Sequence, residues 1–589
     1  MGRFGALRHF ILMAGLALIV AAARPAAAGD PATILAGNHP DEAAEVVGEA
    51  AASASRPLAM RLTMAIRNRA ELTRLLADQQ NPASPQYHRW LTPDEFTGRF
   101  GPTDAELARV ARWLKKKGFT VKSADASTRE ISFIGTVAQA ENVFAVKIGA
   151  TADGRLYSNT VDPAVPADLA PLIESINGLD NLLHSKPAVH RVPKRDSSAH
   201  SPDAIVNGTG PAFGPADIYT FYDETPLLNA GIDGSGAGCI AVIEDSNIDE
   251  DAANAFNSQF GLPALTIGAN FNIVLVDKSD PGQTVDEDET MVDVNYSHTV
   301  APGSSIRIYL GDQNTSKYSA ILDAIHAAVR EKNSPCSAIS ISFGFCGGSN
   351  GFYQAQNGLF KQAASQGQSV FVATGDNGAA GLRFSAKQGA CVTATTRGVS
   401  ELAASPHVTA IGGTEFTPDY DVDGNDVGFV SESVWNDGSH AAGGGQSKAF
   451  KKPAFQKGLI PGDKKRDVPD IAFGASPNSP GFFFGGRDPD SNAPAVECCI
   501  GGTSIGAPSW AGISQLISQQ EGAWVGNLNT RLYQLGAEAD AATTGIRDVT
   551  SGDNSFNGVT GFSAVPGYDK ASGWGTVDMN LFVPAYLGL

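Results

Sequence analysis

Ser504 lies in a sequence context that suits a nucleophile. The stretch Gly501–Pro508 leads from glycines into the serine, and an apolar helical pattern through Trp510 and Leu516 follows. A hydroxyl at the start of a helix meets free backbone N–H groups and the positive end of the helix dipole, which favour a developing negative charge. Adjacent glycines allow a substrate backbone to come close. The same pattern also fits an N-cap serine in a tight turn, so catalysis requires partners from other segments.

Three acidic residues are the candidate partners of Ser504. Glu289 and Asp293 are spaced i, i+4, and on a helix this spacing puts both carboxylates on one face. Two like charges this close repel each other unless they share a proton or lie on a face exposed to solvent. The acidic run 286–288 just before them fits a solvent-exposed acidic face, which is the alternative to a catalytic pair. Asp376 follows an apolar strand in a turn flanked by glycines, where an Asx turn is the alternative.

The elements that carry these residues predict an α/β domain from about residue 216 onward. Buried-strand runs alternate with helical patterns at 316–332 and 352–366. Such alternation is typical of a parallel sheet covered by helices on both faces. Sites in these sheets lie beyond the carboxyl ends of the strands. The strand runs are Cys239–Ile243, Ile273–Val276, Ile306–Leu310, Ala338–Phe343 and Val370–Thr374.

The chain begins with the features of an exported protein. Arg3 and Arg8 precede an apolar run and the small residues Ala26–Ala28, so residues 1–28 are predicted to be a signal peptide. No later run of about 20 apolar residues occurs in the sequence, so no membrane anchor is predicted. The formal net charge of −19 argues against a nucleic-acid partner and suits a secreted protein.

Residues 29–190 are predicted to form a separate α+β domain, because 589 residues are too many for one core. Strand and helix patterns alternate around a small sheet, and Thr92 and Thr103 begin the capping boxes of two helices. The stretch 185–210 then changes to Ser, Pro, Lys and Arg. This composition predicts an exposed linker with a processing site within 191–210, and a plain tether is the alternative.

Export permits disulfides among the six cysteines, and the sequence leaves their pairing open. Cys336 and Cys346 are close enough in sequence to close a short segment. Cys498 and Cys499 are adjacent, and strain disfavours a bond between them. No Cys/His pair has the spacing of zinc ligands, so a zinc site is not predicted.

Two motifs resemble the subtilisin superfamily of serine peptidases. Gly502–Pro508 reads Gly-Thr-Ser-x-x-Ala-Pro, and an apolar strand ends in Gly-Asp-x-Gly at 375–378. A conventional subtilisin mechanism would use Asp245, His298 and Ser504, and this assignment stays open as an alternative. However, His298 lacks the His-Gly-Thr-His context of those enzymes.

The chain is more similar to the sedolisin, or kumamolisin-like, serine-carboxyl peptidases. Their signature of Glu-x-x-x-Asp, a Ser-Gly-Asp-like turn and Gly-Thr-Ser occurs here in the same order, at Glu289, Asp376 and Ser504. Pro82–Pro93 resembles the signature of the family's activation domain. The resemblance implies a subtilisin-like parallel sheet with flanking helices in residues 211–589, preceded by an inhibitory α+β propeptide.

The resemblance also assigns catalytic roles. Ser504 would attack the scissile carbonyl, with Glu289 as general base and Asp293 holding Glu289, while a protonated Asp376 would donate to the oxyanion. A carboxyl base, with a reference pKa near ~4.3, still accepts protons in acid, where histidine (~6.5) is charged. The expected enzyme is a secreted, monomeric, acid-active endopeptidase of proteins or peptides. It would be released from its own inhibitory propeptide, with a mature chain that begins within 196–215.

By resemblance, the C-terminal block would hold one structural calcium ion. Two carboxylates and several turn carbonyls suit a hard cation. Asp548 and Asp569 would supply side chains, and Val549, Val565 and Gly567 would supply backbone oxygens. A pair of turn aspartates is the alternative. A different alternative for the whole protein, a catalytically silent secreted binding protein, predicts a broken triad, and no break is visible in the sequence.

Overall fold

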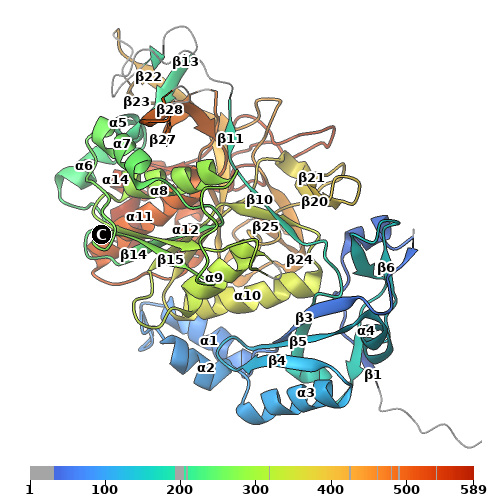
Figure 1. Cartoon of the computed structure of the whole chain (residues 1–589). Coiled ribbons are helices and arrows are strands. Elements are labelled where there is room, and N and C mark those ends of the chain that lie inside the picture. Colours follow the sequence, from blue (N-terminus) through green and yellow to red (C-terminus); the bar gives the residue numbers. More distant parts are fainter. Residues whose placement is uncertain are drawn as a thin grey trace, which may run out of the picture.

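The computed structural model describes residues 32–588, except 49, 193–204, 207–209, 317–318, 423–425, 461, 479, 488–490 and 539. Two parts are visible: a small α+β domain near the N-terminus and a large α/β domain (Figure 1). In Figure 1 the small domain, in blue, lies beneath helices α9 (Ala320–Arg330) and α10 (Asn350–Ser365) of the large domain. The predicted signal peptide, 1–28, lies outside the described residues.

The small domain is built on a four-stranded antiparallel sheet in the order β4, β5, β3, β9. Both predicted capping boxes are confirmed. Thr92 begins α2 (Pro93–Phe100) and Thr103 begins α3 (Asp104–Lys116), and each threonine hydroxyl accepts from the amide of a glutamate in the first turn. Helix α4 spans Val137–Phe144. The strands are β3 Pro57–Met64, β4 Thr120–Asp125, β5 Glu130–Thr136 and β9 Ile173–Asn177.

An eight-stranded sheet forms the centre of the large domain, in the order β15, β16, β14, β17, β19, β22, β23, with β26 paired to β22. All neighbouring strands pair in parallel except β23, which is antiparallel to β22. All five predicted strand runs lie side by side in this sheet, although the run 338–343 divides into β17 and β18 (Phe343–Cys346). The strands are β14 Cys239–Glu244, β15 Phe271–Leu275, β16 Ser305–Leu310, β17 Ala338–Ile341, β19 Ser369–Ala373, β22 Thr409–Tyr420, β23 Asp426–Val434 and β26 Ile471–Gly474.

Helices cover both faces of this sheet. Helices α8 (Glu287–Val300) and α11 (Gly506–Glu521) pack together on one face, and α9 and α10 lie on the other. Successive residues of β14 point into different cores: Ile240 joins the first and Ala241 the second. This arrangement confirms the predicted α/β class and buries α8 along most of its length, so polar residues on α8 are enclosed.

Polar contacts hold the small domain against the large one. Trp90 donates its indole N–H to Trp524 O at 3.1 Å, and Arg61 pairs with Asp323 of α9 at 3.3 Å. These contacts join the two domains, so the segment that leaves the small domain starts next to the large domain.

The cysteine pairs in the described residues are Cys239–Cys336, Cys346–Cys391 and Cys498–Cys499. Cys336 and Cys346, although close enough in sequence to be linked, pair with different cysteines. Cys239 begins β14 and Cys336 precedes β17, and because these strands are parallel neighbours their starts lie side by side. The adjacent Cys498 and Cys499 are joined to each other, contrary to the expectation from strain.

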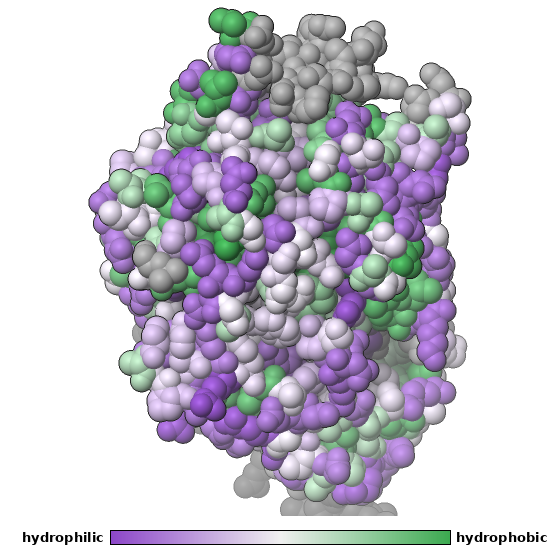
Figure 2. Space-filling view, turned by 90° about the vertical axis from the view of Figure 1, so that its left-hand side faces the viewer, coloured by the Kyte–Doolittle hydropathy of each residue, from purple (hydrophilic) through white to green (hydrophobic). Residues whose placement is uncertain are grey.

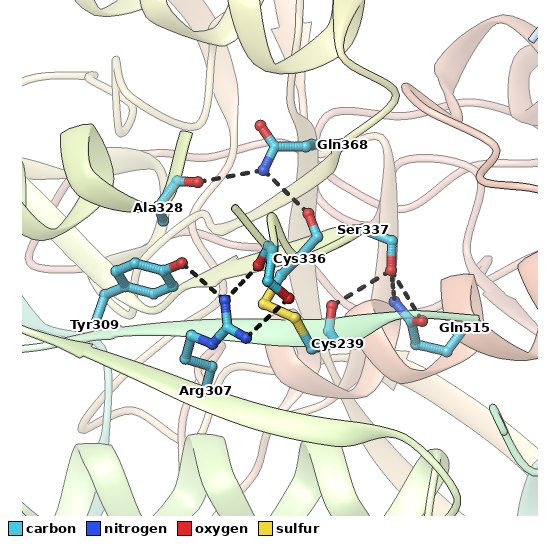
Figure 3. Close-up of a disulfide and its surroundings, with 9 residues drawn as sticks. Cys239, Arg307, Tyr309, Ala328, Cys336, Ser337, Gln368 and Gln515 are labelled. Atoms are coloured by element: carbon cyan, nitrogen blue, oxygen red, sulfur yellow. Dashed lines mark hydrogen bonds between the residues drawn. A yellow bond between two sulfur atoms is a disulfide. The ribbon is translucent and has the colours of Figure 1, made fainter. Parts of the chain in front are cut away.

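The surroundings of the first disulfide are shown in Figure 3. Gln368 donates to Ala328 O and Cys336 O at 3.3 and 3.0 Å, which ties the strand starts to the end of α9. Ser337, beside Cys336, is hydrogen-bonded to Gln515 of α11. This disulfide thus belongs to the edge of the sheet opposite to the carboxyl ends of the strands.

Glu224 is a buried carboxyl at the start of α6 (Thr225–Asn229). Its exposed fraction is 0%, and within the described part of the chain neither of its carboxylate oxygens has a hydrogen-bond partner. Burial raises the pKa of Glu224 well above its ordinary range. The folded protein therefore favours the neutral acid at this position.

The face shown in Figure 2 is mostly hydrophilic, with hydrophobic residues in limited patches. Val427, Phe429 and Val430 on β23 are among the exposed apolar side chains. Within the described ranges, no helix has both the length and the apolar character needed to cross a bilayer.

Candidate active site

Ser504 lies between strand β28 (Pro494–Gly501) and α11, at the N-terminal end of the helix. The side chain is fully buried, and its hydroxyl donates to Ser342 O at 3.5 Å. Gly502 has a φ of 136°, and a Cβ there would collide with the carbonyl oxygen of Ala188. A glycine is therefore required in this turn, both for its conformation and for the close approach of another chain segment.

Glu289 and Asp293 lie on one buried face of α8, as their spacing predicts. Ser342 and Ser340 donate to the two oxygens of Asp293 at 2.6 and 3.2 Å. Burial and the charge of Asp293 raise the pKa of Glu289 well above its ordinary range, while its contact with the Ser504 hydroxyl opposes this shift. Burial also raises the pKa of Asp293. Carboxyls this close and this buried share protons rather than ionise together.

A third buried carboxyl, Glu244, joins this pair and was missed in the sequence. It ends β14, and Thr290 of α8 donates its hydroxyl to Glu244 Oε2 at 3.0 Å. Burial, with the charges of Asp293 and Glu289, raises the pKa of Glu244. The only sequence signal is an acidic residue that closes an apolar strand, and the neighbouring Asp245 carried the subtilisin-type assignment instead.

Asp376 lies against the turn that carries Ser504. It follows β19 at the carboxyl end of the strand, where the sequence pattern predicts it. Asp376 Oδ1 accepts from the backbone N–H and the hydroxyl of Thr503 at 2.9 and 2.8 Å, and Oδ2 lies 3.1 Å from His190 Nε2. A Cβ at Gly502 would lie 2.7 Å from the same Oδ2, so this carboxyl oxygen and the Ala188 carbonyl both approach Gly502.

His298 lies away from this cluster. It is nine residues beyond Glu289 on α8, or about two and a half turns, so its side chain leaves from the opposite side of the helix. Its Nε2 lies 2.7 Å from Pro263 O, and burial lowers the pKa of His298. The structure brings Ser504 to Glu289 and not to His298, which does not support the conventional subtilisin assignment.

An extended segment of the chain crosses Ser504. Strand β10 (His184–Pro187) pairs antiparallel with β18, and β11 (His190–Arg191) pairs antiparallel with β28. Between these strands, Ala188 N donates to Ser342 O at 3.0 Å, and Ser504 N donates to Ala188 O at 3.2 Å. In Figure 1 the segment runs upward from the small domain along the large one.

This crossing corrects the expected exposure of the stretch 185–210 at its N-terminal end. Residues 185–190 are buried or half-buried, because strands of the large domain flank them on both sides of Ala188. The Ala188 carbonyl is held by the Ser504 backbone amide, beside the Ser504 hydroxyl and the Glu289 carboxyl. A peptide carbonyl is thus presented to a hydroxyl that has a carboxyl beside it, which is the arrangement acyl transfer requires.

The residues predicted to bind calcium lie in two segments, 548–549 and 565–569, which a hydrogen bond joins. Asp548 Oδ2 accepts from Gly567 N at 2.7 Å, and Asp569 Oδ2 accepts from Val565 N at 3.0 Å. Burial raises the pKa of both aspartates. Nowhere in the described chain do three or more His, Cys, Asp or Glu side chains gather closely enough to hold a metal. A cation here would depend on two carboxylates and backbone oxygens, including that of Val549, and this donor set fits a hard cation.

Comparison with known proteins finds related proteins for both parts of the chain. Residues 44–182 match the family model of the pro-kumamolisin activation domain. The chain is 26% identical over 542 residues to sedolisin of Pseudomonas sp. (strain 101), covering 88% of this chain and 85% of the relative. It is 28% identical over 576 residues to kumamolisin of Bacillus sp. (strain MN-32), and the match covers 92% of this chain and 94% of the relative.

A solved structure agrees with these sequence relatives. Pseudomonas sedolisin, described as a serine-carboxyl proteinase in complex with pseudo-iodotyrostatin, matches with a TM-score of 0.53 and 25% identity, over 65% of this chain and 99% of that one. The matched share of this chain is about as long as the large domain that carries Ser504, and the family model matches residues of the small domain. The chain is therefore a serine peptidase related to sedolisin and kumamolisin, with a pro-kumamolisin activation domain ahead of its α/β domain.

Proposed function

We propose that the protein is a secreted serine-carboxyl endopeptidase that cleaves proteins or peptides in acid. The observation that carries this proposal is the Ser504 backbone amide, which donates to Ala188 O while the Glu289 carboxyl lies close to the Ser504 hydroxyl. Glu289 takes the hydroxyl proton as Ser504 attacks and returns it to the leaving amine. Asp293, fixed by two serine hydroxyls, orients Glu289 and shares its protons.

The oxyanion is stabilised from two sides in this proposal. The Ser504 N–H, which holds Ala188 O, is one donor. Asp376, beside the same turn, is the other, and a carboxyl donates only while it carries a proton. A fall in pH protonates the Glu289 cluster and removes the base, so activity should decline at the low-pH end of the pH profile.

The small domain acts as the inhibitory propeptide in this proposal, comprising residues 29–190, with 191–210 as the processing linker and 211–589 as the enzyme. The match of 44–182 to an activation domain and the segment that crosses Ser504 support it. Export rests on the predicted signal peptide. The released enzyme is proposed to act as a monomer.

The pH–rate profile on a denatured protein tests the proposed function. Between about pH 2 and pH 8 we expect a bell-shaped dependence of the rate on pH, with activity only at acidic pH. This activity should be absent in Ser504→Ala and retained in His298→Ala. Activity at neutral pH that is lost in His298→Ala would establish the subtilisin mechanism instead, and a processed but inactive wild type would favour a binding protein.

We also propose one structural calcium ion, held by Asp548 and Asp569 with the backbone oxygens of Val549, Val565 and Gly567. A bound cation stabilises the folded state in proportion to its affinity and concentration. Chelation at constant pH should therefore lower the Tm by several degrees, and Ca²⁺, but not Mg²⁺, should restore it. Asp548→Asn should have a lower Tm that no longer responds to the chelator. An unchanged wild-type Tm, with no metal in the purified protein, would contradict the proposal.

A further inference from the structure

We propose that the site selects substrates with a basic side chain at the third residue after the scissile bond, through an acidic subsite formed by Asp288, Glu497 and Phe484. This inference rests on the proposed peptidase function and names a class of substrate for it. Arg191 of the segment that crosses Ser504 occupies this subsite in the structure.

The position of Arg191 relative to the scissile bond follows from the backbone contacts. The Ala188 carbonyl is the one held at the Ser504 amide, so the bond presented for attack joins Ala188 to Val189. Residues after that bond continue along β28, where Arg191 pairs with Ile500. Arg191 is therefore the third residue on the leaving-group side.

The Arg191 guanidinium contacts two carboxylates on different elements. Its Nη2 donates to Asp288 Oδ1 at 3.1 Å, and its Nη1 lies 3.2 Å from Glu497 Oε2. The guanidinium carbon lies 4.7 Å from the centre of the Phe484 ring on β27 (Gly481–Arg487), within the range of a cation–π contact. Two negative groups and an aromatic face around one cation favour Arg or Lys over neutral or acidic residues.

The subsite is rigidly tied to the catalytic residues. Asp288 precedes Glu289 in the first turn of α8, and Glu497 lies on β28, the strand that leads into Ser504. The Glu497 side chain is only 16% exposed and lies over Gly486, where a Cβ would come within 2.7 Å of Glu497 Oε1. These carboxylates belong to the enzyme and not to the propeptide, so they remain when the segment 184–192 departs and a substrate takes its place.

Activated enzyme and a panel of quenched fluorescent peptides test this inference. The peptides keep Lys-Pro-Ala-Val-His and carry Arg, Lys, citrulline or Glu at the next position, and mass spectrometry identifies the bond cleaved. Citrulline retains the shape of arginine without its charge. We expect cleavage between Ala and Val, with kcat/KM for Arg about five-fold above that for citrulline, the effect of a partly exposed ion pair, and the Glu peptide slowest.

Variants separate the subsite from other sources of preference. In the double variant Asp288→Asn with Glu497→Gln, the Arg-to-citrulline ratio should fall to about one. Glu287→Gln removes a carboxyl from the same helical turn that is hydrogen-bonded to Gln283 and acts on Arg191 only through its charge, so this control should retain most of the ratio. If the double variant does not fold, the ratio of kcat/KM for the Arg and citrulline peptides, measured with the wild-type enzyme, tests the subsite on its own.

Two negative results have different meanings. Cleavage of all four peptides at equal rates, or at another bond, would overturn the subsite while the peptidase function stood. No cleavage of any peptide or protein by a correctly processed chain would overturn the proposed function itself.

Discussion

Replacing Ser504 with alanine is expected to leave the precursor intact in acid, while the wild type is cut between Ala188 and Val189. The reason is geometric: the Ala188 carbonyl is held by the Ser504 amide, and the strands on either side fix this bond at the hydroxyl. Acidified wild-type protein should therefore yield a new N-terminus at Val189, measured by sequencing or intact mass. Further trimming would then account for a final start within 196–215.

The control for this experiment is His298→Ala, which alters a buried side chain bonded to Pro263 and should be processed like the wild type. A trace of active wild-type enzyme added to Ser504→Ala shows whether the bond is accessible to a second molecule. Normal processing of purified Ser504→Ala on its own would mean that another protease or another residue makes the cut, and the zymogen proposal would be lost.

Glu289→Gln is expected to lower kcat by about 10²–10⁴-fold, the typical contribution of a positioned general base. Glutamine keeps the shape of the side chain and its place on α8, so the fold should be preserved, but an amide cannot take the Ser504 proton. The measurement is kcat on one peptide after activation in trans, with Ser504→Ala treated identically as the background.

Asp293→Asn separates the base from the residue that orients it. The Asp293 carboxyl accepts from Ser342 and Ser340, and an amide would replace one acceptor by a donor and disturb the shared protons. We expect a smaller loss of kcat than in Glu289→Gln, together with a shift of the acid limb of the pH profile. Wild-type kcat in Glu289→Gln would show that the base lies elsewhere.

Local signals in the sequence predicted the local elements well. The capping boxes at Thr92 and Thr103 specify where two helices begin, because side chain and backbone satisfy each other within four residues. The apolar strand runs likewise predicted the parallel sheet, because buried strands need apolar residues on both faces. The i, i+4 spacing of Glu289 and Asp293 predicted a shared face for the same local reason.

Features that depend on which strands are neighbours could not be predicted. Glu244 joins the carboxyl pair only because β14 lies beneath α8, and Cys239 meets Cys336 only because β14 and β17 are adjacent. The path of Ala188 across Ser504 depends on strand pairing over more than 150 residues of sequence, between β10 and β18 and between β11 and β28. No composition or spacing within 185–210 carries that information.

The buried Glu224 makes the folded state more stable at acidic pH than at neutral pH. A carboxyl whose pKa is raised by burial binds its proton more tightly in the folded chain than in the unfolded one. Below the unfolded pKa of about 4.3, both states are protonated and the group has no effect. As the pH rises from there towards the folded pKa, only the unfolded chain gives up the proton, so the free energy of unfolding falls. The formal net charge of −19 over the whole chain adds self-repulsion at neutral pH, so a protein that leaves an acidic medium would lose structural stability, and this would limit its working lifetime there.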